Sequence, residues 1–243
     1  MTVHSRRGAR LHPALPCDTD TVDTTVLYRE MYTEAEAARL LRVPQSTLHW
    51  WLEGKAPKYR PVIRLEPTGS RVVTWAEFVE SGLLRSYRRI HEVPLRELRD
   101  FIDRLRDKFD VPYPLADRRP YVGPGRQLLI DLQDRSHLDP DFCLVAVASG
   151  QAVLTAPGEE FFERVDWLDD EPAAWRPADD RESPVRIDPL RRFGRPAVRG
   201  ISTEAIAGEM EGGASLEEAA EVFGLPLDVV RWAQSYELSL QAA

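Results

Sequence analysis

The first strong pattern of apolar and polar positions in the chain predicts two short helices between residues 33 and 54. Thr33 and Glu36 have the three-residue spacing of a capping box, so we expect a helix to begin there. Pro44 cannot continue that helix, because its ring clashes with the preceding turn. A second apolar stripe then follows at helical spacing: Leu48, Trp51 and Leu52. Two short helices joined by a tight turn are typical of a helix-turn-helix unit.

Two strand-length runs come next, and they predict a hairpin, or wing, beside the helix pair. The runs cover residues 59–65 and 71–73, and the turn-forming residues 67–70 lie between them. We expect Trp50 and Trp51 to pack in the core or against this wing rather than to stack on bases.

A second capping box, formed by Thr74 and Glu77, predicts another short helix, which Gly82 should end. A longer amphipathic helix is expected from Pro94 to about residue 109, because its apolar residues recur at helical spacing. Residues 1–30 show no period and are expected to form a flexible arm.

The period of the pattern changes after about residue 126. Gln127–Leu132 and Phe142–Ala148 are apolar runs of strand length. The turn signal Ser149-Gly150 predicts that the second run forms a hairpin with Ala152–Thr155. The middle of the chain is therefore predicted to be a small β-rich module.

The last part of the chain has the pattern of three short helices. Ser202 or Thr203 should cap the first of them, and Ser215 with Glu218 forms a capping box at the second. Pro226 is expected to open the third. The two ends of the chain therefore look alike as helix-turn-helix units.

Together these elements predict an α+β fold. Its expected parts are a flexible arm (1–30), a winged helix-turn-helix DNA-binding domain (31–112), a β-rich module (120–190) and a C-terminal helical unit (191–243).

The net charge of −8 hides a difference between the two halves. Residues 1–126 carry 22 Lys and Arg against 17 Asp and Glu, a net charge of +5, whereas residues 127–243 carry 10 against 23, a net of −13. This difference in net charge can arise by chance. If it does not, the first half can face phosphates, whereas nucleic acid would repel most of the surface of the second half. We read no signal peptide and no membrane span, and Cys17 and Cys143 lie far apart, as in a protein of the reducing cytoplasm.

A recognition helix needs polar side chains near its N-terminus. Four such residues point away from the apolar stripe of the second helix: Gln45, Ser46, Thr47 and His49. Basic residues around them form a predicted phosphate-facing set: Arg42, Lys55, Lys58, Arg60 and Arg64. The alternative is a helix pair that packs only on protein.

No constellation of catalytic residues stands out in the sequence. The five histidines do not pair with other ligands at helical spacing, no Cys/His cluster has zinc spacing, and GxxxxGK[ST] and GxSxG motifs are absent. We read the acidic clusters as solvated loops. We therefore expect a protein that is not an enzyme and that uses no metal or cofactor.

Two stretches resemble known families. Residues 32–53 resemble the MerR-like and excisionase-like winged helix. Residues 193–236 resemble the family called domain of unknown function 433, which is widespread among bacterial antitoxins. The second resemblance rests on Gly194-Arg195-Pro196, Val198-Arg199-Gly200, Gly213, Ser215–Glu218, Val229, Val230, Ala233 and Tyr236.

The whole arrangement resembles the long VapB-type antitoxins. That resemblance implies that the chain inhibits a cognate VapC-type toxin, a PIN-domain ribonuclease, and represses its own operon as a homodimer on operator DNA. It also implies that antitoxin arginines pair with toxin carboxylates. The candidates are Arg186, Arg191, Arg192, Arg195 and Arg199.

Other interpretations stay open. The basic residues between 186 and 199 can instead pair within the chain, with Asp179, Asp180 and Glu182. The protein can also be a one-component transcription regulator whose middle module senses a small molecule, which a deep pocket within residues 120–190 would favour. A purely structural dimer is the third alternative.

Overall fold

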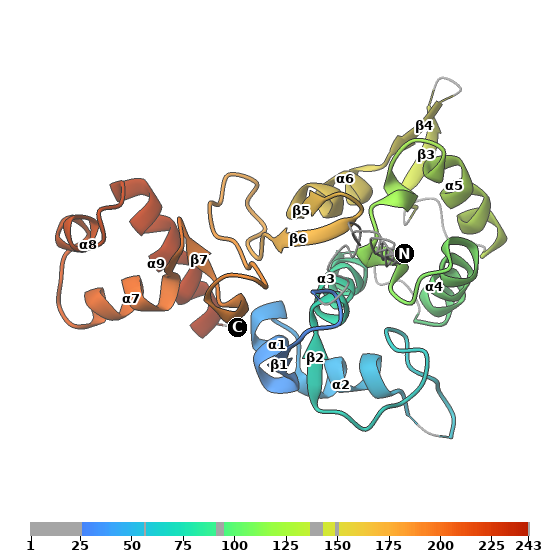
Figure 1. Cartoon of the computed structure of the whole chain (residues 1–243), viewed down its shortest axis with the longest axis horizontal. Helices are drawn as coiled ribbons and strands as arrows, with labels where there is room; N and C mark the ends of the chain where they lie inside the picture. The colour runs from blue at the N-terminus through green and yellow to red at the C-terminus, as the bar shows by residue number, and fades with distance from the viewer. Residues whose placement is uncertain (1–25, 56, 91–94, 137–142, 149–150, 243) are drawn as a thin grey trace, which may run out of the picture.

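The computed structural model describes residues 26–55, 57–90, 95–136, 143–148 and 151–242, so most of the predicted arm lies outside the described residues. Helices and short antiparallel strand pairs mix along the chain (Figure 1), which confirms the α+β class. The helices are α1 (Glu34–Leu41), α2 (Gln45–Glu53), α3 (Trp75–Ile90), α4 (Leu95–Phe109), α5 (Gly125–Arg135), α6 (Ala156–Arg164), α7 (Thr203–Glu211), α8 (Leu216–Phe223) and α9 (Leu227–Gln241). The strand pairs are β1 (Glu30–Thr33) with β2 (Val72–Thr74), β3 (Val145–Ala148) with β4 (Gln151–Leu154), β5 (Val165–Leu168) with β6 (Glu171–Trp175), and β7 (Ala197–Val198) with β8 (Ile201–Ser202).

The N-terminal helix pair forms as the sequence predicts. The Thr33 hydroxyl accepts a bond from the Glu36 N–H at 3.2 Å, and the Glu36 carboxylate accepts one from the Thr33 N–H at 2.9 Å. Arg42 ends α1 in the left-handed conformation, and Pro44 stands at the N-cap of α2. The capping box and the proline break are therefore confirmed.

The predicted wing is wrong. β2 pairs with β1, a strand that precedes the helix pair, and not with residues 59–65. The N–H groups of Val62 and Ile63 donate to the carbonyl of Trp51, and their carbonyls accept bonds from the Arg106 guanidinium. Since these backbone groups are already engaged, the segment cannot form a strand ladder.

The segment just before β1 is not part of a free arm. The carbonyls of Leu27 and Arg29 accept hydrogen bonds from the first turn of α3, from the N–H groups of Ala76 and Trp75 at 3.0 and 3.1 Å. Residues 27–30, which the sequence assigned to the arm, are thus docked against β2 and α3.

Gly82 does not end the helix that begins at Trp75. α3 continues through it to Ile90, and a Cβ at Gly82 would lie 2.7 Å from the ring of Trp175. The glycine therefore serves close packing between α3 and β6. The capping box at the start of α3 is confirmed, since the Glu77 carboxylate accepts the Thr74 N–H at 2.9 Å and the Glu77 N–H donates to the Thr74 hydroxyl at 3.4 Å.

The middle of the chain contains more helix than the sequence predicts. Gln127–Leu132 lies within α5 and is not a strand, because Leu129, Leu132 and Gln133 form one buried helical face. The predicted hairpin is confirmed within the described residues, with Val145 opposite Leu154 in β3–β4.

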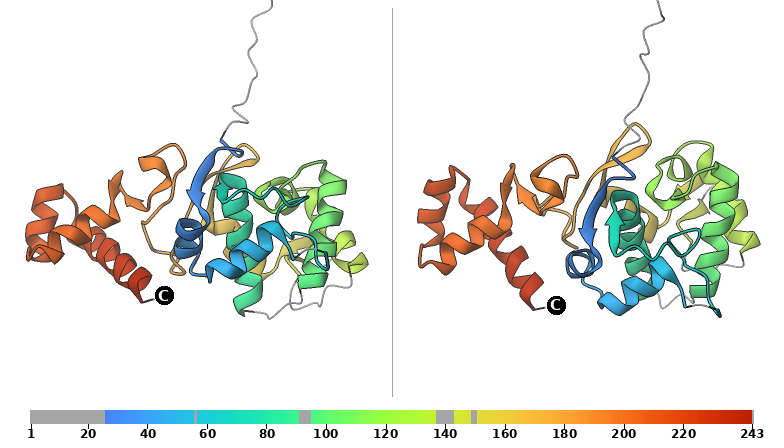
Figure 2. Two further views of the ribbon diagram at one scale, coloured as in Figure 1. Left: turned by 90° about the horizontal axis from the view of Figure 1, so that it is seen from below. Right: turned by 60° about the horizontal axis from the view of Figure 1, so that its bottom comes forward.

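The C-terminal unit has the three predicted helices, and Figure 2 shows them at one end of the molecule. Ser215 and Glu218 form the predicted capping box, and Gly224 closes α8 in the left-handed conformation. Ser202 is the N-cap of α7, but its side chain makes no capping hydrogen bond.

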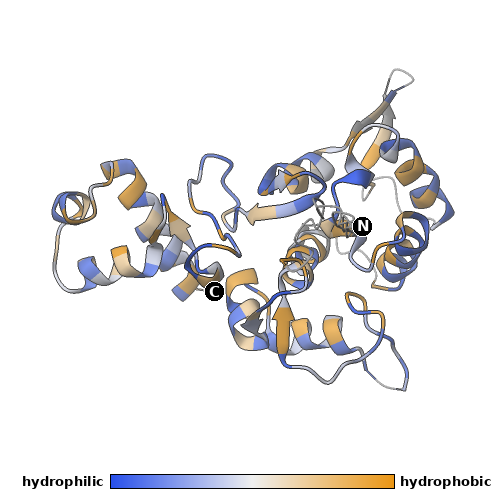
Figure 3. Ribbon diagram, viewed as in Figure 1, coloured by the Kyte–Doolittle hydropathy of each residue, from blue (hydrophilic) through white to orange (hydrophobic). Residues whose placement is uncertain are grey.

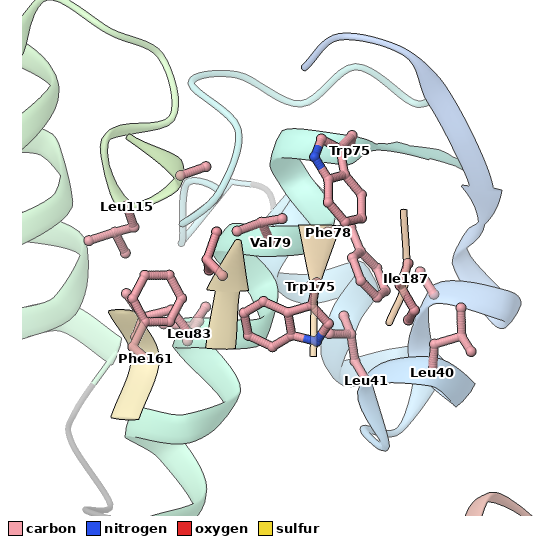
Figure 4. Packing of buried hydrophobic residues seen from close by; sticks show 14 of the residues in the cluster. Leu40, Leu41, Trp75, Phe78, Val79, Leu83, Leu115, Phe161, Trp175 and Ile187 are labelled. Carbon is pink, nitrogen blue, oxygen red and sulfur yellow. The ribbon is translucent and has the colours of Figure 1, made fainter. Parts of the chain in front are cut away.

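Helix α3 lies at the centre of the core. Its residues Trp75, Phe78 and Leu83 pack beside Trp175 of β6 and Phe161 of α6 (Figure 4). The indole N–H of Trp75 donates to the carbonyl of Pro172 at 2.6 Å. Figure 3 shows that the loop after β6 is hydrophilic, as predicted for its acidic residues.

Candidate nucleic-acid and partner interfaces

The N-terminal end of α2 carries polar side chains that are free to reach a DNA groove. Gln45 and Ser46 are exposed in the first turn, and Thr47 is half-buried. Leu48 and Trp51 face the core instead. The fold therefore places three of the four predicted base-contacting residues at one accessible end of the helix.

His49, the fourth, is held by a buried carboxylate. Its Nδ1 lies 2.8 Å from Oε1 of Glu34, and Arg71 donates to Oε2 of the same group at 2.7 Å. Glu34 is 1% exposed and joins α2 to α1 and to the residue before β2. His49 therefore fixes the orientation of α2, whereas the sequence alone suggested a free base contact.

Lys55 and Lys58 stand exposed on the loop that leaves α2. Two backbone hydrogen bonds close this loop, from Lys55 N to Tyr59 O at 2.8 Å and from Tyr59 N to Lys55 O at 2.9 Å. Gly54 has a positive φ of 72°, and a side chain there would collide with the Tyr59 carbonyl. The closed loop holds both lysines just beyond the C-terminal end of α2.

Arg64 does not face phosphates, which corrects the sequence-based prediction. Its side chain is 4% exposed and forms ion pairs with Glu53 and, at 2.7 Å, with Glu77. It also donates to the carbonyls of Ser70 and Val72. A guanidinium with five donors can satisfy all of these acceptors at once, so it ties the loop after α2 to α3.

Arg64 nevertheless shapes the charge of the surface. Burial works against the ionised form of Glu53, but hydrogen bonds from the Gly69 N–H and the Thr68 hydroxyl, together with the charge of Arg64, lower the pKa of Glu53. Glu53 thus stays ionised and shares the Arg64 guanidinium with Glu77. Only 9% of the Glu53 side chain is exposed, so the acidic residue of α2 lies largely beneath the surface that carries the lysines.

Two other predicted phosphate contacts are engaged to different degrees. Arg42 donates to the Ser239 hydroxyl at 2.6 Å and lies over the Tyr236 ring, so it faces α9 rather than solvent. Arg60 pairs with Asp103 at 3.1 Å but keeps 68% of its side chain exposed. Arg60 therefore stays available to a phosphate and Arg42 does not.

The two tryptophans, which the sequence predicts in the core or against the wing, pack to different extents. Trp51 is 2% exposed and belongs to the core, but Trp50 is 38% exposed. Its ring meets that of Tyr59 edge-on, with 6.2 Å between the centroids. Trp50 follows Ser46 by four residues, so the helical period places it on the same outer face; that spacing could have identified it from the sequence.

Four of the predicted toxin-binding arginines border a cleft of about 310 Å³ with Asp166 and Asp188: Arg186, Arg191, Arg195 and Arg199. Their acidic partners differ from the predicted ones: Arg186 pairs with Asp166, Arg191 with Asp188 and Arg195 with Glu204.

Much of this segment nevertheless reaches solvent. Arg191 is 75% exposed and Arg195 64%, and Arg192 and Arg199 are also exposed. Leu190 and Phe193 stand among these arginines with 69% and 81% of their surface exposed. The segment therefore offers both charge and apolar area to a partner.

A larger cleft of about 680 Å³ separates α1 from the C-terminal unit and is lined by Met31, Glu36 and Arg39 on one side and by Glu204, Glu211 and Glu237 on the other. It lies outside residues 120–190 and so does not favour the interpretation of the middle module as a small-molecule sensor. The smaller cleft takes half of its lining from that range: Asp166, Ala174, Pro184, Arg186 and Asp188.

Within the described part of the chain, no group of three or more His, Cys, Asp or Glu residues is placed to hold a metal ion. A search of the same residues finds no helix that is long and apolar enough to cross a membrane.

The chain is similar to proteins of Mycobacterium tuberculosis. It is 30% identical over 236 residues to the uncharacterized protein Rv2308, an alignment that covers 89% of this chain and 95% of that protein. It is 28% identical over 220 residues to the protein named "Putative antitoxin VapB45", with 83% and 91% covered. The crystal structure of Rv2018 matches with a TM-score of 0.69 and 28% identity, over 84% of this chain and 97% of that one.

No protein-family model matches the chain. The MerR-like and domain-of-unknown-function-433 resemblances therefore stay predictions.

Proposed function

Since this chain belongs to the same protein family as Rv2308 of Mycobacterium tuberculosis, we propose that it is the antitoxin of a toxin–antitoxin pair and that it also binds operator DNA. The similarity to a relative named as a VapB antitoxin, over most of both chains, supports the antitoxin role. The toxin would be a VapC-type PIN-domain ribonuclease. The antitoxin would work in the cytoplasm, without catalysis of its own, and would bind DNA as a homodimer.

One observation carries the DNA-binding part of this proposal. The segment that follows α2 exposes Lys55, Lys58 and Arg60, while the Glu53 side chain at the end of the helix is 9% exposed and paired with Arg64. Phosphates of the duplex would bind the basic residues and hold the protein in place, and the head of α2 would read base edges. Gln45 has an amide that can pair with the N6 and N7 atoms of adenine.

The exposed segment between Leu190 and Arg199 supports the toxin-binding part. Guanidinium groups bind carboxylates in charge-assisted bonds that contribute roughly 1.5–3 kcal/mol each. The carboxylates that hold Mg²⁺ in a ribonuclease would accept such bonds. Leu190 and Phe193 would add apolar contact beside these arginines.

A gel-shift titration tests the DNA-binding part. The full chain should bind the promoter of its own operon more tightly than unrelated DNA, and its affinity should fall steeply with salt. Replacing Arg60 should weaken all sequences alike, whereas replacing Gln45 should reduce the discrimination between them. Equal affinity for promoter and unrelated DNA contradicts a specific repressor.

Co-expression with the neighbouring toxin gene tests the antitoxin part. Growth should be rescued by the intact chain and lost on deletion of residues 183–243. That deletion also removes the contacts of Arg42 and Tyr32 with the C-terminal part. Arg191→Glu with Arg195→Glu is therefore the sharper variant, and Arg231→Glu on the exposed side of α9 is its control. A doubly substituted chain that still protects cells and still co-purifies with the toxin contradicts this interface.

A further inference from the structure

The exposed indole of Trp50 occupies the centre of the outer face of α2. Successive residues of an α-helix are about 100° apart, so Ser46 and Trp50 lie one above the other. This row is opposite Leu48 and Leu52, which are fully buried. Gln45 stands to one side of the row. If the N-terminal turn of α2 contacts base edges in the major groove, Trp50 therefore faces the same groove.

The surrounding residues hold the ring in this position. Tyr59 meets it edge-on, with an angle of 64° between the ring planes, and the Lys58 ammonium lies 5.2 Å from the centroid of the Tyr59 ring. Tyr59 is itself 41% exposed, and its backbone is fixed by the two hydrogen bonds to Lys55. An aromatic pair that is held open to solvent has a surface ready for a partner.

We propose that Trp50 is a specificity-determining residue that packs against thymine methyl groups in the major groove of bound DNA. This inference rests on the proposed DNA-binding function of α2. The methyl group is the one apolar feature that a base edge presents in that groove, and it is present on thymine alone. The flat indole face is apolar and lies one helical turn beyond Ser46, so it would contact the base pairs next to those that the polar head reads.

The charges around the ring favour DNA over a second copy of this chain. A two-fold interface brings the same patch of both subunits together. Here that would place Lys55 and Lys58 of one subunit against those of the other, which is repulsive. Phosphates on both sides of a groove complement the same lysines.

The test compares two versions of one DNA fragment, the promoter of the chain's own operon synthesised with thymidine or with deoxyuridine, which lacks only the methyl group. The intact chain should bind the thymidine version at least about fourfold more tightly, the effect of burying one methyl group. Trp50→Ala should bind both versions equally. Tyr59→Phe, which keeps the ring, should retain the preference, and Val222→Ala, an exposed apolar side chain on α8, should leave it unchanged.

The outcomes separate this inference from the function on which it rests. If the intact chain does not distinguish promoter from unrelated DNA, the proposed function fails. If it binds the promoter specifically but Trp50→Ala keeps the full preference for thymidine, the function stands and the role of Trp50 is overturned.

Two further measurements complete the test. Trp50→Ala should still unfold in one cooperative thermal transition, at a lower temperature than the intact chain because the partly buried ring loses its packing against Tyr59. Sedimentation should give the same mass for both, and loss of a dimer in Trp50→Ala would assign the face to a second copy and overturn the proposal.

Discussion

The two ends of the molecule contain helix pairs with the same local construction. α1 begins with the capping box of Thr33 and Glu36, and α8 begins with that of Ser215 and Glu218. Both helices are eight residues long. In both, the hydroxyl and the carboxylate exchange bonds with backbone N–H groups that the helix itself leaves free. The start of each pair is therefore a local event that needs no tertiary contact.

The connections between the helices also match. Arg42 and Gly224 are the C-caps, both in the left-handed conformation, with φ of 53° and 62°. The residue after each cap donates to the carbonyl five residues before it, at 3.0 Å in both cases. Pro44 and Pro226 then stand at the N-caps of α2 and α9.

The surfaces and supports of the two pairs differ. Residues 202–242 contain eight acidic residues and one basic residue, Arg231, whereas lysines and arginines surround α2. The N-terminal pair also rests on buried ionic groups, the network of Arg64 with Glu53 and Glu77 and the pair of Glu34 with Arg71, while α9 rests on apolar residues such as Val230 and Ala233. The same local fold thus presents opposite charge, which favours DNA at one end and protein at the other.

The largest expected effect comes from the buried network. Arg64→Met leaves Glu53 and Glu77 without their buried cation, and breaking such a pair costs about 3–5 kcal/mol of stability. Urea unfolding should show this loss. Arg60→Met is the matched control, since its pair with Asp103 is exposed and contributes at most about 1 kcal/mol. Similar losses in both variants would contradict the central role of Arg64.

The second effect concerns pH. Burial raises the pKa of Glu80 to about 8, even though Arg106 and the Leu115 N–H favour its charged form. Between pH 4.5 and 8 the unfolded chain has released this proton while the folded chain keeps it, so stability should fall as pH rises through that window. The slope from this group approaches about 1.4 kcal/mol per pH unit.

Glu80→Gln should flatten this profile, because glutamine keeps an acceptor for the Leu115 N–H without the titration. Denaturation midpoints measured at several pH values between 4.5 and 8 check this. Parallel profiles for the two proteins would show that Glu80 does not titrate in that window.

The third effect tests the contrast in charge. Lys55→Gln with Lys58→Gln should weaken promoter binding roughly tenfold at moderate salt and lower the salt slope by about two, one for each lost phosphate contact. Glu217→Gln with Glu221→Gln changes as many charges on α8 and should leave binding unchanged. A gain in affinity from the α8 pair as large as the loss from the lysine pair would mean that net charge, and not the face of α2, determines affinity.

The smallest effect tests the similarity of the two pairs. Thr33→Ala and Ser215→Ala should each cost about 1 kcal/mol, because each removes a hydroxyl that caps a helix. Ser202→Ala should cost little, since that N-cap makes no side-chain bond. Thermal unfolding of the three variants decides this. A marked loss in the Ser202 variant, or none in the other two, would argue against hydroxyl capping.

The sequence by itself determined the features that depend on neighbouring residues. The capping boxes, the proline breaks and the long helix α4 were predicted correctly, because their signals lie within one or two turns of chain. The acidic C-terminal unit and the polar head of α2 were also visible at this level, since composition needs no fold.

Only the tertiary structure decided how distant segments meet. β1 takes the place beside β2 that the sequence assigned to residues 59–65, and Gly82 continues a helix because Trp175 packs against it. Arg64 was predicted to face phosphates but is buried, and Trp50, predicted to pack in the core or against the wing, is 38% exposed and contacts Tyr59. The charge and hydrophobicity of a side chain indicate which surroundings it favours. The Arg64 guanidinium is buried because Glu53 and Glu77 lie where they can pair with it, and only folding brings these carboxylates together.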